Sequence, residues 1–117
     1  MTLGMDGGCY SAMGSGRFYL REILAQGWLM IALTDEEVLG MEERDDKKGV
    51  RIIVSKDFYG GELVDEARAL EAMRKADVLI LTGDRIIELA IRHGYVNPES
   101  VLRVGKLSHT QVFKFSY

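Results

Sequence analysis

The residues best suited to chemistry gather in two places in the last third of the chain. The first is T-G-D-R at Thr82–Arg85, which follows an apolar run and precedes an amphipathic stretch. A turn from a strand into a helix exposes unpaired backbone N–H groups, which can hold an anion. Thr82, Gly83 and Arg85 are therefore a candidate anion-binding turn. Plain capping by Thr82 or Asp84 is the alternative, because the Asp84 carboxylate could occupy the same N–H groups.

The second place surrounds Gly105, where cationic and hydrogen-bonding side chains accumulate. Side chains of this kind suit contact with RNA phosphates and bases, although an ordinary solvated loop has the same composition. An aromatic ring elsewhere in the chain could stack on a base. The candidate RNA-binding residues are Arg85, Arg103, Lys106, His109, Gln111 and Tyr59.

The net charge of −3 argues against a protein whose whole surface binds phosphate, but the charges are unevenly distributed. Residues 1–83 contain ten Lys or Arg and fifteen Asp or Glu, whereas residues 84–117 contain five and three, together with both histidines. An acidic protein with this asymmetry can carry a local basic face. The composition therefore leaves RNA binding open without establishing it.

The sequence lacks the motifs of the commonest cofactor and metal sites. It has no G-x-x-x-x-G-K-[S/T] phosphate loop and no G-x-G-x-x-G dinucleotide fingerprint. Cys9, His93 and His109 are widely separated in the sequence and cannot make a typical zinc site without several carboxylates. The paired acids Glu36 and Glu37 are best explained by stabilisation of a helix N-terminus. We therefore expect no cofactor and no metal, and we favour a non-enzymatic role while leaving enzymatic activity open.

Several features favour a cytoplasmic protein of one domain. The longest apolar run, Trp28–Leu33, is too short to span a bilayer. The N-terminal residues lack the basic patch and following apolar core of a signal peptide, so none is expected. Cys9 is the only cysteine, which excludes an intramolecular disulfide. We expect no membrane partner. The Gly-rich residues 1–16 are expected to form a flexible extension, and residues 17–117 to form a single domain.

Hydrophobic periodicity predicts alternating strands and helices. Val78–Leu81 is a continuous apolar run, typical of a strand covered on both faces. Thr34 with Glu37 matches a capping box, and Asp65 can cap a further helix. Strands are expected near 17–24, 28–33, 50–55, 77–81, 101–104 and 111–115, and helices near 35–40, 65–75 and 84–93.

Two segments between these elements are expected to be loops. The first, residues 41–49, is a mixed charge run, M-E-E-R-D-D-K-K-G, that should be exposed to solvent. The second, residues 56–62, carries two aromatic residues and two glycines. We expect Phe58 to enter the core and Tyr59 to be the ring available for stacking.

This order of elements predicts an α+β fold. It should be a single compact domain in which an N-terminal hairpin joins a mixed β-sheet and two main helices pack on that sheet. If both helices cover one face, the other face needs cover or a partner, so a homodimer is plausible. Phe113 and Phe115 would be candidate contacts in it.

Five stretches of the chain stand out, in the order A-L-T-D-E-E-V-L-G, F-Y-G-G-E-L-V, G-D-R-I-I-E-L-A-I, V-N-P-E-S-V-L-R-V-G and S-H-T-Q. With these stretches the chain resembles a small archaeal family, domain of unknown function family 424, over about residues 17–112. The resemblance implies a cytoplasmic archaeal protein with no established enzyme activity. Some classifications describe the family as RNA-binding, partly because its genes are associated with translation genes. The chain departs from the family at Ser108, where Pro is usual, and at Thr110, where Ala is usual.

Three functional hypotheses follow. The leading one is a non-enzymatic RNA-associated protein linked to translation, with RNA or ribosome-associated proteins as partners, and a flat basic face would favour it. The second is a small-ligand or anion-binding enzyme subunit that uses the Gly83 turn and His109 as general base, and a pocket joining them to Arg85 would favour it. The third is a protein-interaction module without ligand, which an exposed apolar sheet face would favour.

Overall fold

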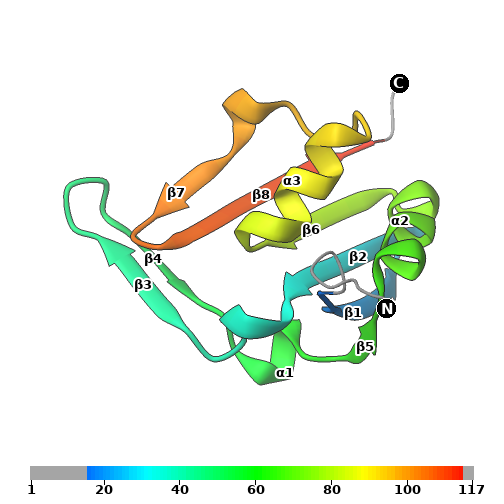
Figure 1. Ribbon diagram of the computed structural model, residues 1–117, viewed down its shortest axis with the longest axis horizontal. Coiled ribbons are helices and arrows are strands. Elements are labelled where there is room, and N and C mark those ends of the chain that lie inside the picture. The colour runs from blue at the N-terminus through cyan, green and yellow to red at the C-terminus, as the bar shows by residue number, and fades with distance from the viewer. Residues whose placement is uncertain (1–15, 115–117) are drawn as a thin grey trace, which may run out of the picture.

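The computed structural model describes residues 16–114. Over this range the strands form a mixed six-stranded sheet, in the order β5-β1-β2-β6-β8-β7, and a separate β3–β4 hairpin (Figure 1). The α+β class predicted from the sequence is therefore confirmed. The strands are β1 (Phe18–Ala25), β2 (Trp28–Asp35), β3 (Glu42–Asp45), β4 (Val50–Ile53), β5 (Glu62–Val64), β6 (Val78–Thr82), β7 (Leu102–Val104) and β8 (Leu107–Phe113). The helices are α1 (Lys56–Tyr59), α2 (Glu66–Lys75) and α3 (Asp84–Arg92), with short 3-10 turns η2 (Glu36–Val38) and η3 (Pro98–Ser100).

The N-terminal hairpin of β1 and β2 forms as predicted. Its register runs without a break from Phe18 opposite Asp35 to Ala25 opposite Trp28. The two turn residues between the strands, Gln26 and Gly27, have φ angles of 54° and 82°. Two successive residues with positive φ give the turn a twist that matches the right-handed twist of the strands.

Strand β6 lies at the centre of the large sheet. It pairs in parallel with β2, from Met30 beside Val78 to Thr34 beside Thr82, and antiparallel with β8 on its other edge. All five residues of β6 are buried. Its sequence is a continuous apolar run because its side chains are buried among neighbouring side chains on both faces of the sheet.

Helices α2 and α3 pack against the same face of the sheet, as predicted (Figure 1). Alternate residues of β2 and β6 point toward them, and Ile31, Leu33, Leu79 and Leu81 are fully buried there. Burying each such side chain contributes about 1.5–3 kcal/mol. Met73 of α2 is also fully buried in this cluster, which forms the main core of the protein.

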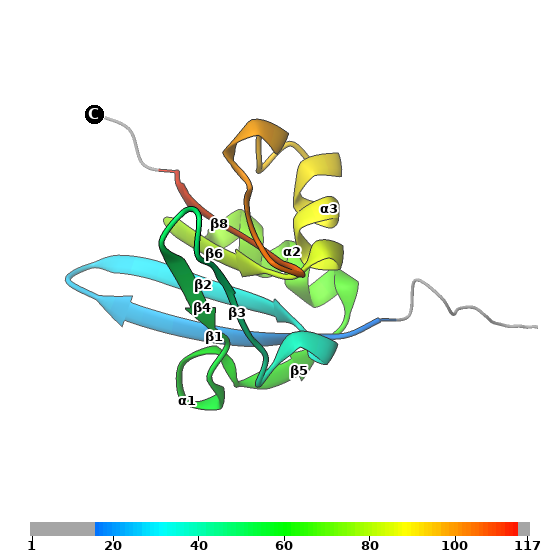
Figure 2. The same cartoon turned by 90° about the vertical axis from the view of Figure 1, so that its left-hand side faces the viewer.

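The opposite face of the sheet is called the open face below. It is formed at its centre by Met30, Ala32, Val78 and Ile80, and Tyr59 of α1 packs against these residues. Figure 2 shows the β3–β4 hairpin crossing in front of β1 and β2, with α1 below β1. These two elements leave part of the open face without cover.

The segment 41–49, expected to be a loop, contains β3 and pairs with β4. Arg51 Nε donates to Glu42 Oε2 at 2.6 Å across the hairpin. The strand was missed because β3 reads E-E-R-D and buries no apolar side chain on either face. Alternation of apolar and polar residues, the signal of a half-buried strand, is absent from such a sequence.

Two further predictions were wrong in their local detail. The segment 56–62 contains α1 and the start of β5, and Phe58 is 39% exposed whereas Tyr59 packs on the sheet. The last strand spans Leu107–Phe113 and not 111–115, so the polar S-H-T-Q stretch is part of a strand. Polar residues fit here because β8 pairs with β6 along one edge and with β7 along the other.

Some predictions lie outside the described residues. These are the flexible extension, apart from Gly16, and the Phe115 contact. Within residues 16–114, no helix combines the length and the apolar composition that a membrane crossing requires.

Candidate functional site

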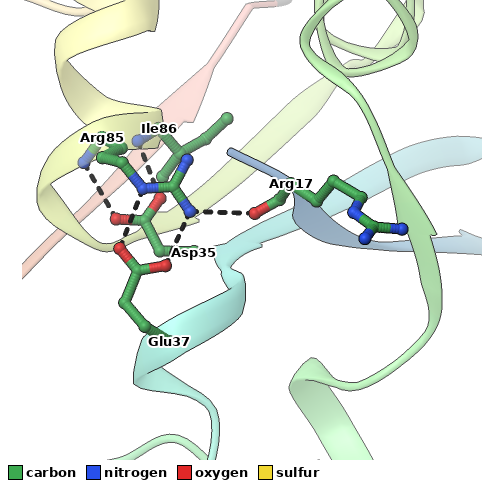
Figure 3. Close-up of polar contacts among 5 residues, drawn as sticks. All are labelled: Arg17, Asp35, Glu37, Arg85 and Ile86. Carbon is green, nitrogen blue, oxygen red and sulfur yellow. Dashed lines mark hydrogen bonds and ion pairs between the residues drawn. The ribbon is translucent and has the colours of Figure 1, made fainter. Parts of the chain in front are cut away.

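The first site candidate is the junction where β2, η2 and α3 meet (Figure 3). Asp35 ends β2, and its carboxylate accepts hydrogen bonds from the backbone N–H groups of Arg85 and Ile86, each at 2.9 Å. Because β2 and β6 are parallel neighbours, the end of β2 lies beside the start of α3. The helix is therefore capped by a residue 50 positions earlier in the chain.

This arrangement overturns the expected local caps. The N-cap position of α3 is Gly83, which has no side chain, so neither Thr82 nor Asp84 caps the helix. The Thr34 capping box is also absent, since Thr34 lies within β2 and η2 has no side-chain cap. A Cβ at Gly83, whose φ is 117°, would collide with the Asp35 carboxyl group. Glycine is thus required at this turn, because the carboxylate fills the space beside it.

Arg85 completes the junction through its side chain. Its guanidinium donates to both Glu37 carboxylate oxygens, at 2.8 Å from Nε and 2.6 Å from Nη2. Nη2 also donates to the Arg17 carbonyl at 3.0 Å, and the group lies 4.8 Å from the centre of the Phe18 ring. Such a two-pronged pair fixes the guanidinium in one orientation. Arg85 is therefore already engaged by groups of its own chain.

The junction shifts the pKa values of its carboxyl groups in opposite directions. Burial raises the pKa of Asp35 to about 6, against the lowering effect of the Arg85 and Ile86 N–H groups and of the Arg85 charge. The hydrogen bond from Arg85 lowers the pKa of Glu37. The Asp35 carboxylate stands where an anion at the helix N-terminus would sit, so a bound anion would have to displace it.

The second candidate is a polar cluster on the side of the open face. Thr82 Oγ1 lies 2.9 Å from His109 Nδ1, the two residues being opposite each other in the β6–β8 register. Tyr59 joins them through a hydrogen bond with Thr82, while burial raises the pKa of its hydroxyl group. Burial lowers the pKa of His109, so its imidazole is neutral at pH 7.

Thr34 lies beside Thr82 in the same cluster. It is fully buried, and its hydroxyl oxygen has no hydrogen-bond partner within residues 16–114. The cluster thus contains hydroxyl and imidazole groups but no charged side chain. In the part of the chain that the structure describes, no three His, Cys, Asp or Glu side chains are placed to hold a metal ion.

Arg103 is engaged in a third set of contacts, at the outer side of α3. Its Nη1 donates to Asp84 Oδ1 at 3.0 Å and to Ser108 Oγ at 2.8 Å, and Ser108 in turn donates to Asp84 at 2.6 Å. Lys106 is exposed in the turn between β7 and β8. Arg103 therefore serves as an anchor between β7 and α3.

The six candidate RNA-binding residues do not share one surface. Arg85 belongs to α3, and Arg103 bonds to the N-terminus of that helix. His109 and Gln111 lie opposite Thr82 and Ile80, which places them on the open face together with Tyr59. Arg85 and Arg103 are thus separated by the sheet from His109, Gln111 and Tyr59, so these five residues form no common flat face.

A third candidate was missed by the sequence analysis. A groove of about 330 Å³ crosses the uncovered part of the open face, beginning at the turn between β1 and β2. None of its lining residues is charged, and Trp28 and Phe113 are 39% and 62% exposed. Its lining includes Gln26, Trp28, Met30, Val78, Ile80, Gln111 and Phe113.

The sequence held only a partial signal for these sites. The alternation of residues 111–115 predicted an aromatic strand face that includes Phe113. No local pattern related Phe113 to Trp28, because Trp28 lies on β2 and β6 separates β2 from β8. Likewise, Asp35 is one of three consecutive acidic residues in T-D-E-E, and nothing in the sequence distinguished it as a cap of α3. The groove and the cap both require knowledge of strand order.

Fold and sites together define a small α+β protein whose mixed sheet is covered by two helices on one face and partly bare on the other. The chain belongs to the family described as "Protein of unknown function (DUF424)", which matches residues 25–115. The resemblance noted from the sequence is thereby confirmed.

The fold is also similar to the crystal structure of an uncharacterized conserved protein from Methanopyrus kandleri. The TM-score is 0.70 at 22% sequence identity, over 86% of this chain and 94% of that chain. At this identity the likeness concerns the fold alone. No curated protein matches the sequence.

Proposed function

We propose that the chain is a protein-interaction module that binds an uncharged segment of another protein in the open-face groove. The observation that carries this proposal is the groove itself, which is lined without a single charged residue and flanked by the exposed rings of Trp28 and Phe113. Aromatic side chains are enriched at the cores of protein–protein interfaces, where charged side chains are depleted.

Charge supports a protein partner over a nucleic acid. Binding to RNA draws most of its affinity from cations that neutralise phosphates. The groove offers no such cation, and Arg85 and Arg103 are paired with carboxylates of their own chain. A chain with a net charge of −3 also repels a polyanion.

An RNA-associated protein linked to translation is the second candidate. It is favoured by one feature of the groove, in which two exposed rings stand beside the amide of Gln111. Sheet surfaces with aromatic rings can stack unpaired bases and bond to their edges. A cytoplasmic location belongs to both proposals. The enzyme-subunit hypothesis receives no such support, because His109 and the Arg85 side chain lie on opposite sides of the sheet.

Site-specific photo-crosslinking in the native organism tests the proposal. A photoreactive phenylalanine analogue replaces Phe113 in one variant and Leu24 in a matched control. Leu24 is 75% exposed and lies at the same end of the sheet, but its register partner Leu29 packs on the helix side. The pair of variants therefore separates the groove from apolar exposure in general.

A discrete protease-sensitive adduct formed at position 113 and absent at position 24 is the expected result. An adduct destroyed by ribonuclease would replace the proposal with the RNA-associated candidate. An adduct of two copies of the chain would replace it with the homodimer. The proposal fails if both positions yield the same adducts or if position 113 yields none.

A further inference from the structure

We infer that the segment bound in the groove is a proline-rich chain in the polyproline II conformation. This inference rests on the proposed function and names the chemistry of its partner. Exposed aromatic side chains that line an uncharged groove are the surface that such segments select, because their conformation is formed before binding. Three properties of the groove support the assignment, namely its length, its hydrogen-bond donors and its lack of charge.

The groove is long enough for several residues of the proposed ligand. Trp28 lies on β2 and Phe113 on β8, with β6 between them. Met30 and Phe113 are both level with Val78, so Trp28 stands two residues away from the level of Phe113. With strands about 4.8 Å apart and residues about 3.3 Å apart along a strand, the two backbone positions are separated by about 12 Å on a diagonal. A polyproline II helix advances about 3.1 Å per residue, so a segment of about four residues spans the positions of the two rings.

The donors of the groove match what a proline-rich backbone offers. Proline has no N–H group, so such a segment presents carbonyl oxygens that need donors. Gln26 and Gln111 line the groove at its two sides, and each side-chain amide carries donor hydrogens. Between them Val78 and Ile80 form an apolar floor for the pyrrolidine rings.

The absence of charge in the lining excludes partners that are recognised by ion pairs. Acidic, basic or phosphorylated segments would lose their hydration at the groove and gain no counter-charge. A proline-rich segment carries no charge and loses little conformational entropy on binding, because it is already stiff. The groove thus fits this class better than a flexible charged peptide.

The single tryptophan of the chain makes the test direct, since Trp28 lines the groove and its fluorescence reports on that site alone. The full chain is titrated with an acetylated and amidated nonaproline peptide. A Gly/Ser peptide of the same length and a single-stranded oligouridine serve as comparison ligands. The expected result is a saturable change in emission with nonaproline and none with the other two.

Three variants keep the reporter and separate the explanations. Phe113→Ala should weaken binding by about tenfold, the loss typical of an aromatic anchor. Gln111→Leu keeps the size of the side chain and removes its donor, so binding should weaken by about three- to tenfold. Leu24→Ala removes an apolar side chain that lies outside the groove and is more exposed than Phe113, and it should leave binding unchanged. Far-UV circular dichroism verifies that each variant is folded.

The inference is overturned if nonaproline gives no saturable change, if oligouridine gives one, or if Gln111→Leu tightens binding, as plain apolar association would. A loss of binding in Leu24→Ala as large as in Phe113→Ala also overturns it. If nonaproline fails while photo-crosslinking at position 113 still yields a protein adduct, only the ligand class is wrong. If both fail, the proposed function is wrong as well.

Discussion

The replacement Asp35→Asn tests whether a buried carboxylate at the junction of β2 and α3 is held at an energetic cost. Asp35 is 1% exposed and accepts both N–H groups that begin α3. Asparagine preserves the shape and one oxygen acceptor while removing the charge and its titration. Any pH dependence that belongs to this carboxyl group should therefore vanish in the variant.

The magnitude follows from the raised pKa of the carboxyl group. Burial raises the pKa of Asp35 from 3.8 to about 6, so the folded state binds this proton more tightly than the unfolded state. A tenfold change in proton affinity corresponds to about 1.4 kcal/mol, which gives about 3 kcal/mol for this rise. Because the folded pKa is the higher one, this stabilisation is fully present below about pH 4 and is lost as the pH rises through about 6.

The assay is urea denaturation of both proteins at closely spaced pH values from 4 to 7.5, followed by circular dichroism. The free energy of unfolding of the wild type minus that of Asp35→Asn should fall by about 2–3 kcal/mol over this interval. Groups that titrate in both proteins, His109 among them, cancel in the difference. A carbon-13 NMR titration of the Asp35 carboxyl carbon gives the folded pKa directly.

If the difference in unfolding free energy between the wild type and Asp35→Asn stays constant with pH, the pKa of Asp35 is not raised in the folded state. If this difference rises with pH, the N–H groups that lower the pKa outweigh the burial that raises it. Asp35→Ala provides a second measure at pH 7. It removes both acceptors and leaves two buried N–H groups without a partner, so its stability should lie about 1–3 kcal/mol below that of Asp35→Asn. Equal stability of the two variants would mean that water replaces the cap.

Three further predictions concern neighbouring residues. Gly83→Ala should lower the free energy of unfolding by at least about 2 kcal/mol in urea denaturation, because a Cβ there collides with Asp35. Burial lowers the pKa of His109 below its usual 6.5. The free energy of unfolding of the wild type should therefore rise, relative to that of His109→Gln, as the pH rises through 6.5, and urea denaturation of both proteins over a pH series measures the difference. Arg85→Met removes the hydrogen bond that lowers the pKa of Glu37, so NMR should find that pKa raised.

Local sequence patterns determined the elements whose causes are local. The continuous apolar run of β6 reflects the burial of its side chains on both faces, and the stripe of Ile86, Ile87 and Ala90 reflects the buried side of α3. Asp65 caps α2 from the position immediately before the helix, as the sequence predicts. In each case the residues that cause the structure lie within a few positions of it.

Elements with polar sequences were placed by their partners and not by their own pattern. Strand β3 forms because β4 pairs with it, and the S-H-T-Q part of β8 forms because β6 and β7 flank it. Backbone hydrogen bonds to a neighbour can hold a strand whose side chains lack the apolar alternation. A pattern read along one segment does not show which other strand will pair with it.

The sequence by itself therefore determined the class of fold, the hairpin, the two helices on one face and the family to which the chain belongs. Only the tertiary structure decided that Asp35 caps α3, that Arg85 and His109 lie on opposite sides of the sheet, and that Trp28 and Phe113 flank one groove. The physical reason is common to all three. Each depends on which strands are neighbours, and strand order is set by the packing of the whole chain.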